Sequence, residues 1–176
     1  MKPATDHPAP RIALALLLLG TVGLTTAQET TEAPAPPVEL SADTAEVNDA
    51  TGVSIYRGNV ILTRGRMEII GAVMTVTTDE NRELERIVVE GSPARYTETL
   101  PDAPTRQAEA PRMEYYASGP ERIILLEGGR LWQGDNEVLG ETITHYPAEQ
   151  RTIAEGGQAE GGRVNVTVYP DSDESP

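Results

Sequence analysis

The chain has 176 residues and a formal net charge of −14 at pH 7, with 14 Lys and Arg against 28 Asp and Glu. This acidic balance excludes a nucleic-acid-binding protein, because few cations are left to neutralise phosphates. The chain has no Cys and only two His, which excludes a disulfide framework, a thiolate or His-rich zinc site and a Cys nucleophile.

The first segment, residues 1–27, is expected to be a secretory signal peptide. Lys2 and Arg11 precede an uncharged, mostly apolar stretch at 12–24, and the small residues that follow it end at Ala27. The alternative is a retained membrane anchor, but a spanning helix needs about 20 strongly apolar residues and this run is shorter. Cleavage after Ala27 would send the chain to a bacterial periplasm or cell surface.

The remainder is expected to comprise a Pro-rich lead-in at 28–37, a single β-domain at 38–170 and an acidic tail at 171–176. Within the domain, short segments alternate apolar and polar residues, are rich in β-branched side chains and are separated by turn signals. No segment has the sustained apolar spacing of a helix. Strands are expected at 38–40, 60–63, 67–69, 74–77, 84–89, 94–96, 113–115, 123–126, 137–139, 142–145 and 164–168.

An internal repeat runs through this domain. Four times an apolar strand meets a Gly and restarts, at Gly58, Gly91, Gly128 and Gly156. The longest match aligns 58–71 with 128–140, with one residue dropped at the turn. Each Gly is expected to mark a bend in a strand, and the repeats must stack because one repeat cannot bury its own apolar face.

The segment 56–69, Tyr-Arg-Gly-Asn-Val-Ile-Leu-Thr-Arg-Gly-Arg-Met-Glu-Ile, resembles the repeat of the OstA-like family of lipopolysaccharide-transport proteins. Shorter matches follow in the same order. They lie at 91–96, 110–115, 127–129, 140–144 and 163–170, so that the resemblance covers Val38 to Pro170. The sequence departs from the family at Gly129-Arg130, where a small or apolar pair is usual.

The resemblance implies an all-β fold, an open and slightly twisted β-jellyroll of stacked antiparallel strands. It implies a periplasmic bridge protein that carries lipopolysaccharide from the inner to the outer membrane, with the lipid A acyl chains inside the roll. The implied partners are OstA-like domains of the inner-membrane and outer-membrane transport components and further copies of the chain, joined head to tail. It implies no enzymatic activity, no cofactor and no metal.

One face of the strands is expected to line the interior of the roll. Alternation assigns ten residues to this inner face: Val38, Leu40, Val60, Leu62, Met67, Ile69, Met74, Val76, Ile87 and Val89. The resemblance adds Tyr96 and Tyr115 as residues that line the acyl-chain groove, Met113 shares the parity of Tyr115, and the repeat alignment adds Leu126, Trp132, Val138 and Ile143. An apolar face is usually simple core. The absence of Phe to fill the centre and the adaptable Met side chains favour a groove.

Arg130 falls at a position that this alignment turns inward. It would then pair with a lipid phosphate or a carboxylate. Alternatively, the register slips by one residue there, which would turn every side chain of that strand to the other face.

The first strand, Val38 to Ser41, and the last, Val164 to Tyr169, are expected to be unpaired edges. Val38 and Leu40 on the first and Val164, Val166 and Val168 on the last are the expected contacts for strand addition by a partner. Pro170 would end the ladder, because it has no N–H to donate. Such a contact does not close on itself, so open filaments are expected.

Other interpretations remain at this stage. His145 could be a general base, but a single His without a positioned nucleophile is typical of an ordinary strand residue. The acidic segments 79–80 and 135–137 lack the ligand spacing of a calcium loop and are typical of solvated turns. Alternative functions are a membrane-anchored sibling in the same pathway, a ligand-free β-solenoid, and a carbohydrate-acting enzyme with paired carboxylates.

Overall fold

A computed structural model describes residues 36–157 and 162–170, and in this part of the chain all regular structure is β-strand. The expected signal peptide, nearly all of the lead-in and the acidic tail lie outside the described residues. No helix among the described residues is long and apolar enough to cross a membrane. The strands are β1 (Val38–Ser41), β2 (Thr44–Asn48), β3 (Val53–Arg64), β4 (Met67–Thr78), β5 (Leu84–Glu98), β6 (Arg106–Tyr116), β7 (Arg122–Leu126), β8 (Gly129–Gln133), β9 (Asn136–Gly140), β10 (Thr142–Tyr146), β11 (Arg151–Glu155) and β12 (Asn165–Thr167).

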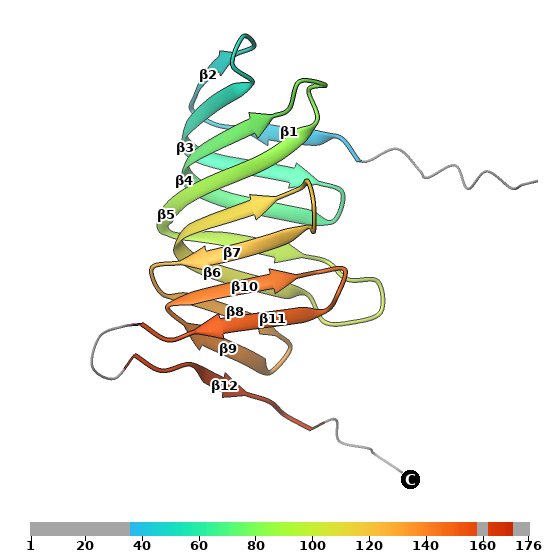
Figure 1. Cartoon of the computed structure of the whole chain (residues 1–176), viewed down its shortest axis with the longest axis vertical. Helices are drawn as coiled ribbons and strands as arrows, with labels where there is room; N and C mark the ends of the chain where they lie inside the picture. Colours follow the sequence, from blue (N-terminus) through green and yellow to red (C-terminus); the bar gives the residue numbers. More distant parts are fainter. Residues whose placement is uncertain (1–35, 158–161, 171–176) are drawn as a thin grey trace, which may run out of the picture. The chain divides into compact units, whose positions relative to one another are not determined.

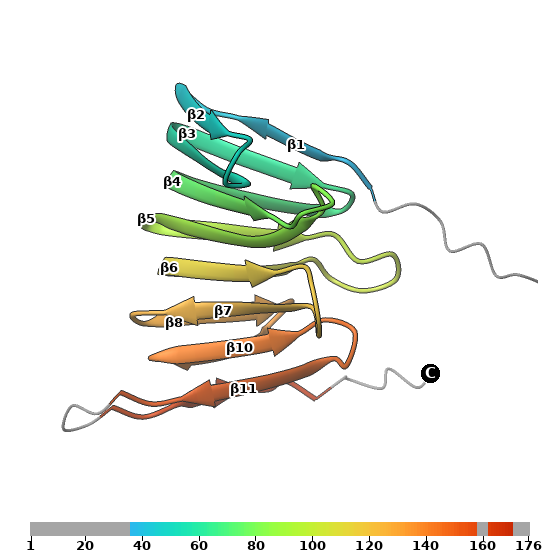
Figure 2. The same ribbon diagram turned by 45° about the horizontal axis from the view of Figure 1, so that its top comes forward.

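The strands stack antiparallel in chain order from β1 and β2 at one end to β11 and β12 at the other (Figures 1 and 2). The long strands β3 to β6 bend midway, so that each contributes to two leaves that face each other. Leaf I contains β2, residues 53–57, 73–77, 84–90 and 112–116, and then β7, β10 and β11. Leaf II contains β1, residues 60–64, 67–71, 94–98 and 106–110, and then β8, β9 and β12.

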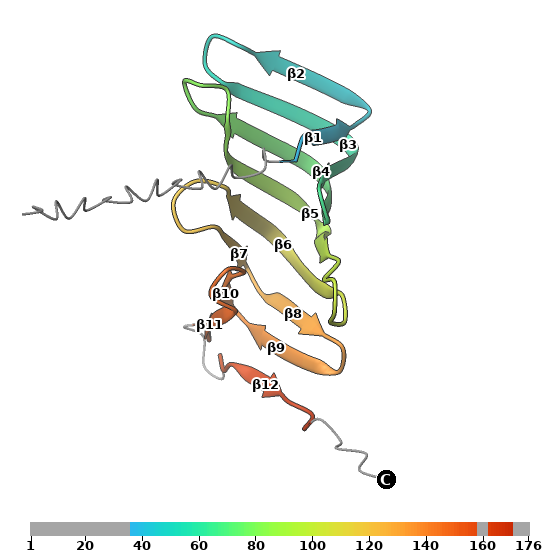
Figure 3. The same ribbon diagram turned by 90° about the vertical axis from the view of Figure 1, so that its right-hand side faces the viewer.

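Beyond β6 the two leaves are built from separate strands, and Figure 3 shows β7, β10 and β11 diverging from β8, β9 and β12. The leaves are joined along the bend side, and the backbone ladders of the described strands do not close the opposite side, which we call the open side. The all-β open jellyroll predicted from the sequence is therefore confirmed.

Glycines permit the bends that connect the leaves. Gly58 and Asn59 both have positive φ values, of 79° and 46°, and the β3–β4 register shifts between Arg57 and Val60. At the next bend, a Cβ added to Gly71 would collide with the side chain of Val89. The first bend thus requires left-handed backbone and the second requires close approach, and Gly satisfies both needs.

Three strands, β2, β8 and β11, were not among those expected from the sequence. β2 is exposed along its whole length and pairs only with β3, while β11 pairs only with β10. Both lie at ends of leaf I, where one face of a strand has little to pack against. The apolar alternation that reveals a buried strand is therefore weak in both segments.

A charged network crosses the outer face of leaf I. Glu114 is largely buried and accepts hydrogen bonds from Arg112 Nη2 at 3.1 Å and Tyr116 Oη at 2.8 Å, and it pairs with Arg86 Nη2 at 2.7 Å. Arg112 also reaches Glu90 at 2.7 Å. Burial alone would raise the pKa of Glu114, but the hydrogen bonds from Arg86, Tyr116 and Arg112 together hold it below its usual value. The network ties β5 and β6 together outside the core.

Replacing this carboxylate, as Glu114→Gln, is expected to lower the free energy of unfolding by about 2 kcal/mol at pH 7, because two arginines lose a buried charged partner. A carboxyl group whose pKa is lower in the folded than in the unfolded state stabilises the fold above the unfolded-state pKa. This contribution is lost as the pH falls through the folded-state pKa. Urea unfolding at pH 7 and pH 3 measures this, and the difference between wild type and variant should be smaller at pH 3. Glu149→Gln, in an exposed ion pair with Arg151, is the control and should change nothing measurable. An equal effect at both pH values would contradict the ionic explanation.

Candidate functional site

The interior between the two leaves contains most of the side chains that the sequence assigned to the inner face. Twelve of them are buried there: Val60, Leu62, Met67, Ile69, Met74, Val76, Ile87, Val89, Tyr96, Met113, Tyr115 and Ile143. Leu40 and Val138 are partly buried against this core, whereas Val38 has the same parity but is 40 % exposed at the end of the roll.

The inner-face assignment is wrong for Leu126 and Trp132. Leu126 is opposite the outward-facing Arg112 on β6, and its neighbour Leu125 occupies the interior. Trp132 lies outside, with the Arg130 guanidinium 4.5 Å from its ring, while Leu131 is buried inside. The register slip considered at Arg130 is thus real, and Arg130 pairs with Glu137 on the outer face.

Several interior residues were not predicted from the sequence. Ile123 and Leu125 belong to a predicted strand that was given the wrong parity, and Leu131 lies in β8, which was not among the predicted strands. Ala94, Ala108 and Ala110 also face inward, and small side chains carry little alternation signal.

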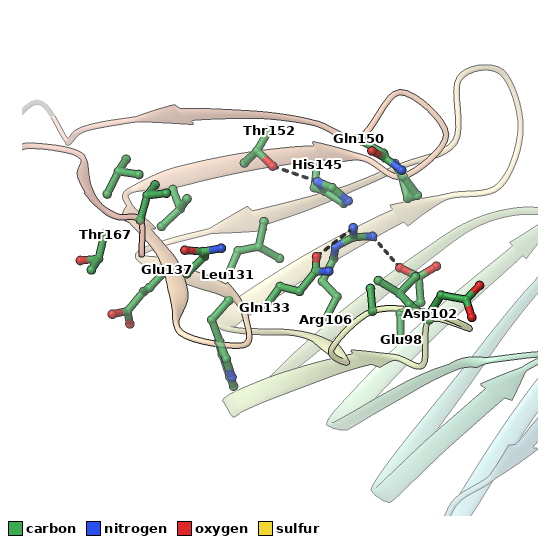
Figure 4. Close-up of a pocket in the computed structure, with 18 of the residues that line it drawn as sticks. Glu98, Asp102, Arg106, Leu131, Gln133, Glu137, His145, Gln150, Thr152 and Thr167 are labelled. Atoms are coloured by element: carbon green, nitrogen blue, oxygen red, sulfur yellow. Dashed lines mark hydrogen bonds and ion pairs between the residues drawn. The ribbon is translucent and has the colours of Figure 1, made fainter. Parts of the chain in front are cut away.

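The interior is filled at one end and hollow at the other. Around the middle strands, Leu62, Ile69, Met74, Ile87 and Met113 are each below 2 % exposed and leave no room for a ligand without rearrangement. Toward the C-terminal end, a cavity of about 710 Å³ opens between the leaves (Figure 4). Apolar side chains of Leu131, Val138, Val166 and Val168 line part of it, together with polar groups from both leaves.

Polar contacts bridge the open side of the filled part. Arg64 Nη1 on leaf II donates to Tyr115 Oη on leaf I at 2.9 Å, and Tyr115 Oη donates to Glu121 at 2.6 Å. Burial, followed by the hydrogen bond to Glu121, raises the pKa of Tyr115. The phenol therefore stays protonated and remains a donor at neutral pH.

A second polar cluster borders the cavity. Arg106 is largely buried and donates to Glu98 Oε2 at 2.9 Å and to Gln133 Oε1 at 3.2 Å (Figure 4). Tyr96 Oη also donates to Glu98, at 3.2 Å. Burial and the neighbouring Glu98 raise the pKa of Tyr96. The cluster is formally neutral, with one guanidinium and one carboxylate.

His145 faces this cluster from leaf I. Its Nδ1 lies 2.9 Å from Thr152 Oγ1 on β11, and Figure 4 shows the ring between Thr152 and Arg106. Burial, followed by the positive charge of Arg106, lowers the pKa of His145 to about 4. The imidazole is therefore neutral at neutral pH.

The acidic segments form turns. Asp79 Oδ1 accepts the backbone N–H groups of Asn81 and Glu83 at 2.9 and 2.8 Å, which ties the carboxylate to its own loop. Among the described residues, no three His, Asp or Glu side chains come together as a metal site. The geometry thus offers apolar binding between the leaves and hydrogen bonding along the open side.

Both ends of the stack have unpaired edges within the described part of the chain. β1 and β2 form one end and β11 and β12 the other, each paired on one side only. β12 is shorter than the strand expected at Val164–Tyr169, and beyond its C-terminal end the Tyr169 N–H donates to the Asn136 side chain. Val166 and Val168 are 60 % and 69 % exposed, and Val164 is half-buried.

Comparison with known proteins gives consistent matches. Residues 39–151 match the family model described as "LptA/(LptD N-terminal domain) LPS transport protein". The lipopolysaccharide export system protein LptH of Pseudomonas aeruginosa is 32 % identical over 129 residues, covering 73 % of this chain and 72 % of that protein. LptA of Escherichia coli strain K12 is 26 % identical over 136 residues, covering 76 % and 71 %.

The fold matches as well. The crystal structure of LptH from Pseudomonas aeruginosa, described as the LptA-homologous periplasmic component of the lipopolysaccharide transport device, superposes with a TM-score of 0.70. The identity in this comparison is 27 %, and the match covers 77 % of this chain and 96 % of the LptH chain.

Proposed function

Because the chain belongs to the LptA/LptD N-terminal-domain family of lipopolysaccharide transport proteins, we propose that it carries lipopolysaccharide across the periplasm from inner to outer membrane. The acyl chains lie between the two leaves, and the polar part of the lipid lies at the open side. The inner-face residues named above are the proposed contacts, with Leu125 and Leu131 in place of Leu126 and Trp132.

The observation that carries this proposal is an apolar inner face that continues to both ends of the roll. Val38 and Val47 extend it on the terminal strands at one end, and Val166 extends it at the other. All three are at least 40 % exposed, which is costly for a protein that functions alone. A conduit segment explains this exposure, because the next segment would cover these side chains and extend the apolar path.

The same ends support assembly. Unpaired strand edges offer free N–H and C=O groups to an incoming strand. We therefore propose head-to-tail association of copies of this chain, and pairing with related domains of the inner-membrane and outer-membrane components. β1 and β12 are the proposed contact strands on leaf II.

Photo-crosslinking tests the interior path. A photoreactive phenylalanine analogue at Tyr96 or Tyr115, each 3 % exposed, is expected to capture lipopolysaccharide in cells, because both rings border the acyl-chain path. Immunoblotting for a lipid-shifted band measures the capture. Probes at Glu68 and Thr75, which alternate with inward-facing residues of β4, are the controls and should give no adduct.

Equal capture from the inner and outer positions would show that the lipid does not distinguish the two faces. Capture at the outer positions alone would place the path on the outer surface. Either result would contradict transport between the leaves.

A further inference from the structure

His145 has an unused hydrogen-bonding atom inside the roll. The residue is 3 % exposed, its Nδ1 contacts Thr152, and its Nε2 is buried without a hydrogen-bond partner among the described residues. The ring lines the cavity and faces the Arg106 cluster across it (Figure 4). A buried polar atom without a partner is destabilising, so its presence calls for an explanation.

The repeat shows that packing does not require histidine there. When Gly65 is matched to Gly134 and Gly71 to Gly140, His145 takes the position of Val76. Val76 packs in the interior as an ordinary apolar residue. The second half therefore places a polar side chain where the first half uses an aliphatic one, and it does so beside the cavity.

The charges around the ring decide what it could bind. Arg106 is already neutralised by Glu98, and the imidazole is neutral at neutral pH. A phosphate bound here would lie near the Glu98 carboxylate as well as the Arg106 guanidinium, so the cluster would offer it no net positive charge. A purely apolar chain would leave Nε2 without a partner.

A hydroxyl group is uncharged, and it can form the hydrogen bond that Nε2 lacks. If His145 Nδ1 donates to Thr152, Nε2 is an acceptor, and if Thr152 donates to Nδ1, Nε2 carries the proton. A hydroxyl both donates and accepts, so it pairs with Nε2 in either tautomer without adding charge. Leu131 and Val138 are cross-strand neighbours on leaf II, and they give the cavity an aliphatic wall that fits the carbon chain carrying such a group.

We propose that His145 is a recognition site for a hydroxyl group carried on an acyl chain of the transported lipid. This inference rests on the proposed function, in which acyl chains enter the space between the leaves. It adds a chemical selectivity, since chains with a hydroxyl at the right depth are preferred over plain chains of the same length.

Competitive binding of fatty acids to the purified chain tests this selectivity. The probes are tetradecanoic acid and three derivatives with one hydroxyl near the carboxyl end, at mid-chain or near the methyl end, each displacing a fluorescent fatty acid. For the wild-type chain, one derivative should bind about fivefold more tightly than the plain acid, as expected for one additional hydrogen bond. His145→Val should abolish this preference and bind the plain acid at least as well. Thr144→Val, on the opposite face of β10, is the matched control and should keep it.

A measurement on the wild-type chain makes the test independent of the variant's folding. His7 is the only other histidine, so the imidazole signal of His145 is readily assigned in nitrogen-detected NMR. The preferred hydroxy acid should shift the Nε2 resonance, and the plain acid should not. Equal affinities for all four acids, or a preference that persists in His145→Val, would overturn the site but leave acyl-chain binding intact. Failure of every acid to displace the probe would overturn both the site and interior binding.

Discussion

A chain that lacks residues 163–176 is expected to remain monomeric at concentrations at which the full chain forms head-to-tail oligomers. The deletion removes β12, the terminal strand of leaf II, together with the exposed Val166 and Val168. These residues supply the free edge and the apolar side chains on which an incoming β1 would pair. The truncated chain should still bind lipid, because the buried residues between the leaves remain, but it should fail to support transport.

Sedimentation velocity over a range of concentrations measures the association, and growth of a strain that depends on this gene measures transport. A chain that lacks only residues 171–176 is the matched control, since it keeps the whole of β12, and it should behave like the full chain. Circular dichroism shows whether the longer deletion retains its β-structure. Oligomers of unchanged size in the 163–176 deletion would exclude the C-terminal edge of leaf II and point instead to β11.

The inward-facing residues on the buried strands of the first half could be predicted from alternation. Val60, Leu62, Ile69 and Met74 lie on strands with an unbroken period of two on each side of a bend, and all four are buried. Alternation works here because one face of each strand packs in the core and the other meets water. The free outer edge of β1 was also predictable, because this strand carries apolar residues at the end of the domain.

In the second half, Leu126 and Trp132 were predicted one residue out of register, and the cause is the bend between them. The left-handed pair is Gly58–Asn59 in the first half and Glu127–Gly128 in the second, with positive φ at all four residues. Matching Gly58 to Gly128 therefore shifts the strand that follows by one position. Matching Gly58 to Glu127 removes the gap from the alignment and places Leu131 opposite Leu62, both inside.

The polar clusters could not be predicted from one sequence. Arg64 and Tyr115 are far apart in the chain and meet only because the leaves face each other at the open side. The pairing of Arg106 with Glu98 likewise depends on the β5–β6 register. His145 was predicted as an ordinary strand residue. It shares the parity of Ile143, which was predicted to face inward, but its position opposite Arg106 follows only from the way the two leaves face each other.

The ion pair between Arg106 and Glu98 is expected to show strong energetic coupling. The two side chains are 11 % and 18 % exposed and are 2.9 Å apart at the border of the cavity. Arg106→Met alone should lower the free energy of unfolding by about 3 kcal/mol, because it leaves a largely buried carboxylate with only the Tyr96 hydroxyl as partner. Glu98→Met should cost a similar amount, because it leaves the guanidinium with Gln133 alone.

The double variant Arg106→Met/Glu98→Met should be within about 1 kcal/mol of wild type, since two apolar side chains can replace a buried pair at little cost. Urea unfolding of the four chains at low protein concentration completes the double-mutant cycle. The exposed pair of Arg57 and Glu46, 3.9 Å apart, provides the control cycle and should couple by less than about 0.5 kcal/mol. Additive losses in the Arg106–Glu98 cycle would mean that each side chain stabilises the roll through its other contacts. The strong coupling we expect would instead establish the pair as a neutral unit beside the cavity, which is the condition under which His145 discriminates a hydroxyl from an anion.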